Sequence, residues 1–104
     1  MKAYTVLKLN NSKSYNTKFS FMSKTFIARF SWNERLQKRS IQISDNNGNT
    51  IVRTTILHPS TKIEFSSNAR LIGYNGYIFL YEKPDGSGDI ENWSNLYSLI
   101  IFEE

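Results

Sequence analysis

The placement of apolar side chains at every second position constrains this chain more than any other feature of its sequence. Successive side chains of an extended strand point to opposite faces, so this period predicts strands with one buried face. The clearest run covers residues 24–32. The apolar side chains that share one face of this run are Phe26, Ala28, Phe30 and Trp32. Residues 18–22, with Phe19 and Phe21 on one face, and residues 39–44 follow the same pattern.

Turn signals divide the rest of the chain into further short strands. The stretch Asp45–Asn49 contains residues that tolerate a positive φ, which predicts a hairpin turn, and Pro59 ends the strand that follows. We expect residues 77–82 to form an interior strand because they are apolar on both faces. The other expected strands cover residues 4–9, 50–57, 61–65 and 96–102.

The remaining segments are predicted as loops, turns and at most one short helical turn. Loops are expected at residues 10–17 and 84–89, and a turn at residues 66–68. Asp89 is a suitable N-cap for a helical turn at residues 90–95. The sequence therefore predicts one all-β domain, residues 1–104, folded as a small antiparallel barrel or sandwich of about eight strands.

The residue types that most often carry catalysis are scarce in this chain. It contains no cysteine and one histidine, His58, and no carboxylate lies within four residues of that histidine. We therefore assign no catalytic, cofactor-binding or metal-binding residue and predict that the protein is not an enzyme. The apolar run Leu99–Phe102 is too short to span a membrane, and the first residues lack the apolar run of a secretion signal. We expect a protein that stays in the cytoplasm and has no membrane partner.

Charge is unevenly distributed along the sequence. The net charge of +4 combines a basic first part and an acidic second part. Residues 1–40 carry nine basic residues and one acidic residue, a net charge of +8, whereas residues 41–104 carry four basic and eight acidic residues, a net charge of −4. The two parts either pair within the fold or present surfaces of opposite sign to neighbouring proteins.

Basic and aromatic side chains are interleaved between residues 18 and 35, which allows an alternative function. On a small barrel such a surface is typical of single-stranded nucleic-acid binding. Alternation, however, places Phe26 and Phe30 on one face and Arg29 on the other, which favours a core face backed by a solvated basic face. A third hypothesis is a carbohydrate- or peptide-binding module whose stacking surface consists of Tyr74, Tyr77 and Tyr81.

Three stretches, taken in order, carry a more specific signal. They are Arg29–Arg35 with its Trp-Asn pair, Ile41–Gly48 with its Asp-x-x-Gly turn, and Gly76–Tyr81 followed by Asn95–Ile101. This order resembles the small baseplate plug proteins of contractile-tailed bacteriophages, over about residues 18–102. Members of that family usually carry a second tryptophan in the strand after the Trp-Asn pair, where this chain has Arg39–Ile41.

The resemblance implies a structural, non-enzymatic protein of the virion, in the tail baseplate, assembled in the host cytoplasm. It also implies hub, tail-tube and other baseplate proteins as partners and several copies in a symmetric assembly, with no nucleic acid. Polar residues surround Trp93 in the sequence, so among the aromatic residues it is the best candidate for an exposed anchor, with core packing as the alternative. The predicted partner-contact residues are Lys18, Lys24, Arg29, Arg35, Arg39, Trp93 and Tyr97.

Overall fold

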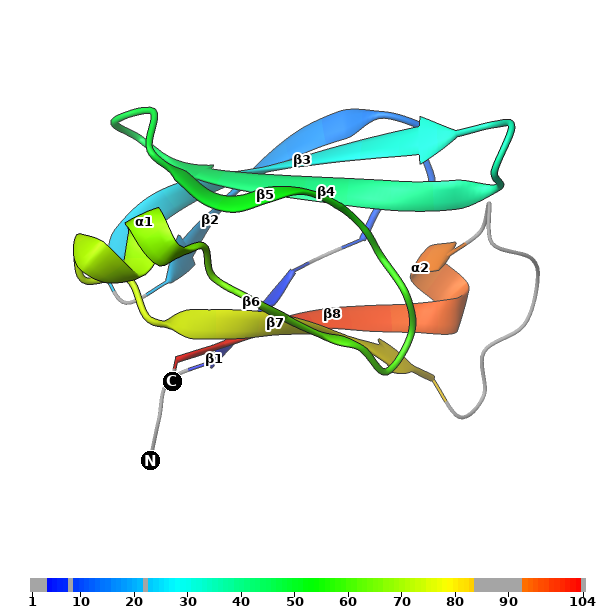
Figure 1. Ribbon diagram of the computed structural model, residues 1–104. Helices are drawn as coiled ribbons and strands as arrows, with labels where there is room; N and C mark the ends of the chain where they lie inside the picture. Colours follow the sequence, from blue (N-terminus) through cyan, green and yellow to red (C-terminus); the bar gives the residue numbers. More distant parts are fainter. Residues whose placement is uncertain (1–3, 8, 22, 84–92, 104) are drawn as a thin grey trace.

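The protein is a β-sandwich of two antiparallel four-stranded sheets, seen in a computed structural model that describes residues 4–7, 9–21, 23–83 and 93–103 (Figure 1). The first sheet has the strand order β1 (Tyr4–Leu7), β8 (Tyr97–Glu103), β7 (Gly76–Glu82) and β6 (Lys62–Glu64). The second sheet has the order β2 (Tyr15–Phe21), β3 (Lys24–Asn33), β4 (Lys38–Asp45) and β5 (Thr50–Ile56). The predicted all-β class is confirmed, as a sandwich.

The alternation in β3 sets the two faces of the second sheet as predicted. Phe26, Ala28 and Phe30 are buried, whereas Arg29 between them is exposed. Strand β2 pairs with β3 so that Phe19 lies opposite Phe26. The aromatic side chains of this hairpin therefore point into the sandwich and leave polar side chains on its outer surface.

The core lies between the sheets and is rich in aromatic contacts that join them. Phe26 of the second sheet meets Tyr74 edge-on, with ring centroids 5.4 Å apart. Phe21 meets Phe65 in the same manner at 6.4 Å. The fully buried aliphatic side chains around these rings include Ile41, Ile43, Ile51, Ile78, Leu99 and Ile101. Edge-on ring pairs of this kind add to the stability gained from burial alone.

The predicted hairpin turn between β4 and β5 is confirmed, and the carboxylate of Asp45 organises it. Asp45 Oδ1 accepts hydrogen bonds from the backbone N–H of Asn47 and of Asn49, at 2.9 and 2.8 Å. Gly48 has a φ of +86°, a conformation that costs glycine little. A buried Asp followed by Asn and Gly therefore closes this end of the second sheet.

Three predicted segments differ from the structure or lie outside its described part. The predicted loop 10–17 is shorter, because β2 begins at Tyr15. The turn expected at residues 66–68 opens a helix, α1 (Ser67–Leu71), which Ser66 caps by accepting a hydrogen bond from the backbone N–H of Ala69. A second short helix, α2 (Trp93–Leu96), overlaps the helical turn predicted at residues 90–95 and ends one residue beyond it. The predicted loop 84–89 and the proposed N-cap Asp89 lie outside the described residues.

Candidate interaction surfaces

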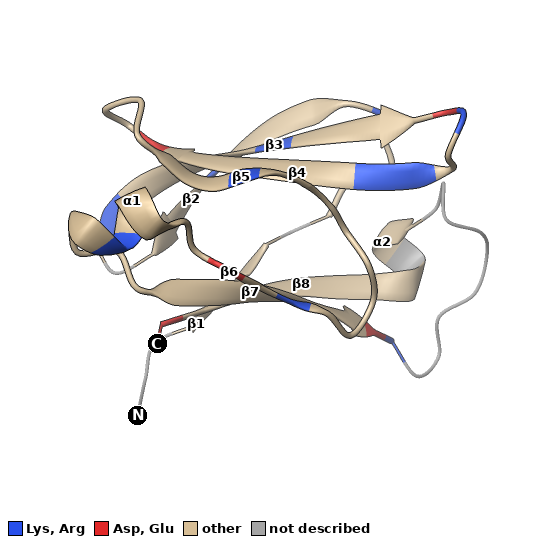
Figure 2. Ribbon diagram, viewed as in Figure 1, with Lys and Arg blue, Asp and Glu red and all other residues tan. Residues whose placement is uncertain are grey.

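The outer surface of the second sheet forms a basic face, which we define by Lys18, Arg29 and Lys38. All three side chains are exposed and lie on strands whose alternate residues fill the core. Figure 2 shows the Lys and Arg positions of the ribbon in blue. Lys18 is paired with Ile27, so Arg29 is its diagonal neighbour across the β2–β3 ladder. Within the described strands β2–β5 the one acidic residue is Asp45, and it is buried. The described strands of the basic face therefore carry no exposed acidic side chain, and the exposed Glu34 lies in the β3–β4 turn at one end of them.

The predicted contact residues do not form one continuous patch. Lys18 and Arg29 lie on the basic face, whereas Arg35 lies in the exposed β3–β4 turn. Lys24 begins β3, and its Nζ lies 4.7 Å from the ring centroid of Tyr74. Tyr97 is half-buried and packs against the core. Only part of the predicted set thus shares a surface.

The prediction that Trp93 is an exposed anchor is wrong, and Arg39 is not a surface residue. Trp93 is 0% exposed and Arg39 is 2% exposed. The indole of Trp93 meets Phe30 edge-on at 5.3 Å and donates its N–H to the backbone carbonyl of Asn10, at 2.7 Å. The ring of Trp93 therefore packs in the aromatic core, and the carbonyl of Asn10 in the N-terminal segment accepts the hydrogen bond from its N–H.

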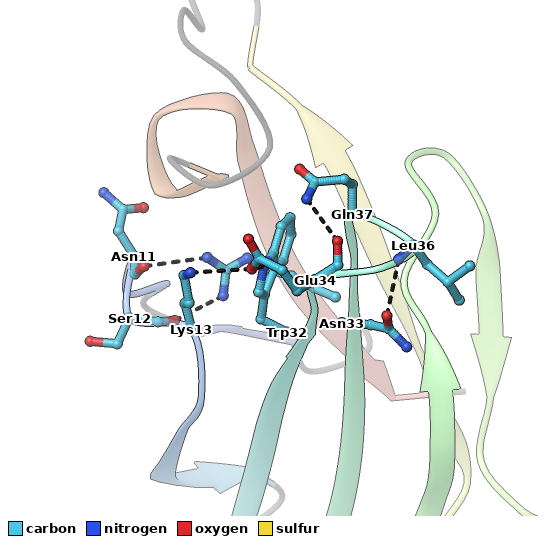
Figure 3. A network of polar contacts seen from close by, with 9 residues as sticks. Asn11, Ser12, Lys13, Trp32, Asn33, Glu34, Leu36 and Gln37 are labelled. Atoms are coloured by element: carbon cyan, nitrogen blue, oxygen red, sulfur yellow. Dashed lines mark hydrogen bonds and ion pairs between the residues drawn. The ribbon is translucent and has the colours of Figure 1, made fainter.

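The same end of the sandwich holds a network of polar contacts (Figure 3). The guanidinium of Arg39 donates hydrogen bonds to the carbonyl oxygens of Ser12 and Asn11, at 2.9 and 3.4 Å. Glu34 accepts a hydrogen bond from the indole N–H of Trp32, at 2.5 Å, and forms an ion pair with Lys13, at 3.2 Å. Donation from Trp32 and then from Lys13 lowers the pKa of Glu34. These contacts tie residues 11–13 to strands β3 and β4.

A small cavity lies beside this network, but its size limits what it can hold. Its lining residues include Arg39, Leu57, Leu80, Trp93 and Tyr97, and its volume is about 180 Å³. Binding sites for small organic molecules usually measure roughly 300–1,000 Å³. The cavity is therefore below the usual range for a substrate or cofactor.

The outer surface of the first sheet is an aromatic face. The side chains on it are Tyr4, Val6, Tyr77, Phe79, Tyr81, Ile100 and Phe102. They point outward because their neighbours in β7 and β8, among them Ile78 and Leu99, are buried between the sheets. Most large apolar side chains of a small domain are placed in its core, so a sheet face with this composition is a candidate binding surface.

Strand register brings the aromatic side chains into rows across the face. Tyr4 and Tyr77 both lie opposite Phe102, and in the next row Val6 and Phe79 lie opposite Ile100. The rings of Tyr77 and Phe102 are stacked at 5.0 Å with an interplanar angle of 21°. The side chains of the aromatic face therefore partly cover one another and form a layer on the outer surface of the first sheet.

The described part of the chain leaves this layer open to solvent. Tyr4 is 61% exposed, Val6 is 56% exposed and Tyr81 is 41% exposed. Figure 1 shows both helices at the ends of the sandwich, away from the outer side of β7 and β8. The central members Tyr77, Phe79, Ile100 and Phe102 are half-buried, so the aromatic face is partly open to solvent and partly covered by its own side chains.

One charged pair borders the aromatic face. Lys62 lies opposite Phe79 and Glu64 lies opposite Tyr77, so both side chains share the outer surface. Their charged groups are 3.4 Å apart, and Lys62 Nζ lies 4.5 Å from the ring centroid of Tyr77. The border therefore carries both signs, in contrast to the basic face.

Sequence reasoning found part of the aromatic face. Two residues of the predicted stacking surface, Tyr77 and Tyr81, lie on the aromatic face. The third, Tyr74, is buried against Phe26. The remaining members were missed. Their signal was the apolar character of both sides of β7 and β8.

Comparison with known proteins identifies no relative of this chain. No protein-family model, curated protein or solved structure matches the chain. In the described ranges, no helix is both long and apolar enough to cross a membrane. Nor do three or more metal-ligating His, Asp or Glu side chains come together in those residues.

Proposed function

We propose that this protein is a structural subunit that joins neighbouring proteins through two opposite faces. The observation that carries the proposal is the aromatic face, a partly exposed apolar layer outside the core between the sheets. The largest apolar patch on a protein surface is often a functional contact site. The basic face on the other sheet supplies a second surface, which suits an acidic partner.

The resemblance to baseplate plug proteins gives this role a setting. In that setting the chain is a non-enzymatic component of the tail baseplate of a contractile-tailed bacteriophage. Its partners are hub, tail-tube and other baseplate proteins, and its location is the virion after assembly in the host cytoplasm. A two-faced sandwich supports such a role because a plug must contact neighbours on more than one side.

Binding of single-stranded nucleic acid is the alternative, and the orientation of the aromatic residues weakens it. Single-strand binding combines a basic groove with aromatic rings on which bases stack. Here Phe26 and Phe30 point into the core, while Lys18 and Arg29 point out. Charge and stacking groups are therefore on different sides of the second sheet.

The test is capture of hub and tail-tube proteins by the purified full-length chain, with charge-reversal variants. Lys18→Glu and Arg29→Glu, both on the basic face, are expected to reduce capture about tenfold or more, because each turns an attraction into a repulsion. Lys83→Glu, an exposed residue that follows β7 in the other sheet, is the matched control and should retain capture. No capture by the wild type, or salt-sensitive binding of single-stranded DNA in its place, would overturn the proposal.

A further inference from the structure

The aromatic face has the size of a modest interface. Strands are spaced about 4.8 Å apart and rise about 3.3 Å per residue, and the four strands contain 4, 7, 7 and 3 residues, so the face covers roughly 330 Å². Two such faces in contact bury about 700 Å², below the roughly 1,000 Å² of a stable interface, so the contact is a weak one that needs a high local concentration. The apolar composition of the aromatic face therefore indicates a binding surface, but its area is too small for a tight complex on its own.

The arrangement of the rings determines which ligands this face suits. Sugars and bases stack on open ring faces, whereas Tyr77 and Phe102 cover each other's faces in a stacked pair. Phe79 and Tyr81 also approach each other closely, with centroids 4.5 Å apart. Each of these rings therefore has one face partly covered by a neighbour. A layer of partly covered rings suits packing against another sheet, which lies about 10 Å away.

The charges at its border make the aromatic face compatible with a second copy of this chain. Contact around a two-fold axis places the same patch on both sides, so the patch must be compatible with itself. The aromatic face meets this condition because the charged groups described at its border, Lys62 and Glu64 with Arg70 paired to Glu64, include both signs. The basic face fails it because Lys18 and Arg29 would meet their own copies. Self-association is thus permitted at one face only.

We propose that the aromatic face is the interface of a symmetric homodimer in which the first sheets of two copies pack face to face. The proposal rests on the function proposed above, and it names the partner of this face. Ile100 and Phe79, opposite each other on the two central strands, lie at the middle of the contact. The dimer places its two basic faces on opposite outer sides. It is a bivalent connector for acidic neighbours.

The test is sedimentation analysis of the full-length chain from low micromolar to near-millimolar concentration. Val6→Lys and Tyr81→Lys, which introduce a charge at exposed positions of the aromatic face, are expected to weaken dimerisation about tenfold or more. Ile56→Lys is the matched control, because Ile56 is 39% exposed on the opposite sheet and Tyr81 is 41% exposed. A wild type that remains monomeric throughout, or a dimer lost only with Ile56→Lys, would overturn the proposal.

A measurement on the wild type alone guards against variants that fail to fold. Backbone amide NMR shifts that change with protein concentration are expected in β1, β7 and β8, and unchanged in β2 and β3. Shifts confined to the second sheet would contradict the homodimer. The two proposals fail separately: capture of hub proteins by a monomer refutes only the dimer, and a dimer that captures none refutes only the function.

Discussion

The guanidinium of Arg39 lies 4.5 Å from the ring centroid of Trp93, and this contact joins strand β4 to helix α2. The same guanidinium lies 5.3 Å from the ring centroid of Trp32. A desolvated cation beside an aromatic ring gains more from the ring quadrupole than an exposed one does. Arg39 and Trp93, both in the predicted partner-contact set, therefore stabilise one end of the sandwich.

The first prediction concerns this buried arginine. Arg39→Ala is expected to lower the free energy of unfolding by about 3 kcal/mol, because it removes the contacts with two indoles and leaves a void beside them. The free energy of unfolding of Arg39→Lys should lie between those of Arg39→Ala and the wild type, because lysine lacks the planar guanidinium. Urea unfolding followed by circular dichroism measures both. Arg35→Ala, in the exposed turn, is the control, and an Arg39→Ala protein as stable as that control would contradict the prediction.

The Arg39–Trp93 contact also shows why this part of the site could not be predicted from the sequence. Alternation is a local signal, and it correctly placed Phe26 and Phe30 in the core and Arg29 outside. Trp93 follows a polar stretch, and its burial depends on β4 and on the carbonyl of Asn10, which are distant in the sequence. Long-range pairing of this kind leaves no periodic trace along the chain.

The aromatic face could not be predicted from the sequence for a different physical reason. A strand that is apolar on both faces is usually covered on both, so β7 was predicted as an interior strand. That prediction is confirmed, because β7 lies between β8 and β6. What the pattern could not show is that no described element covers the outer side of the sheet. A strand covered on both faces by its own protein and a strand with one face in an interface have the same apolar pattern in the sequence.

A second prediction follows from the pKa of Asp45. Burial raises this pKa, but hydrogen bonds from Asn49 and Asn47 outweigh burial, so the pKa lies below its ordinary value of 3.8. A carboxyl group with a lowered folded-state pKa contributes stability above its unfolded pKa and loses it as the pH falls through the folded value. The free energy of unfolding should therefore be constant from neutral pH to about pH 5 and fall below about pH 4.

The variant Asp45→Asn isolates this contribution from those of exposed carboxylates. It should cost about 2 kcal/mol at neutral pH, because charge-assisted hydrogen bonds become neutral ones. The difference between variant and wild type should shrink as the pH falls below 4, where Asp45 is protonated in the wild type. Urea unfolding at several pH values measures this difference. A gap that stays constant with pH would show that the charge of Asp45 has no role.

A third prediction concerns Ser66, the N-cap of α1, which lies in the turn predicted at residues 66–68. Its Oγ accepts from the backbone N–H of Ala69 and donates to the carbonyl of Thr50, each at 3.2 Å, so it links α1 to β5. Ser66→Ala should cost about 1 kcal/mol or slightly more. Ser67→Ala, at the exposed next position, should be neutral within about 0.5 kcal/mol. Thermal unfolding compares the two, and equal effects would argue against the cap.

The last prediction tests how closely β7 and β8 approach at Gly76. A Cβ at this position would overlap the backbone carbonyl oxygen of Phe102 and lie 3.1 Å from two ring atoms of Phe65. Gly76→Ala should therefore cost about 2 kcal/mol or more, since backbone cannot rotate away as a side chain can. Gly48→Ala is the contrast, because its φ of +86° is strained for alanine but no atom lies within 4 Å. That substitution should cost about 1 kcal/mol. If Gly48→Ala proved the more damaging in urea unfolding, the close approach at Gly76 would be refuted, and with it the register that places Phe102 beside Tyr77 on the aromatic face.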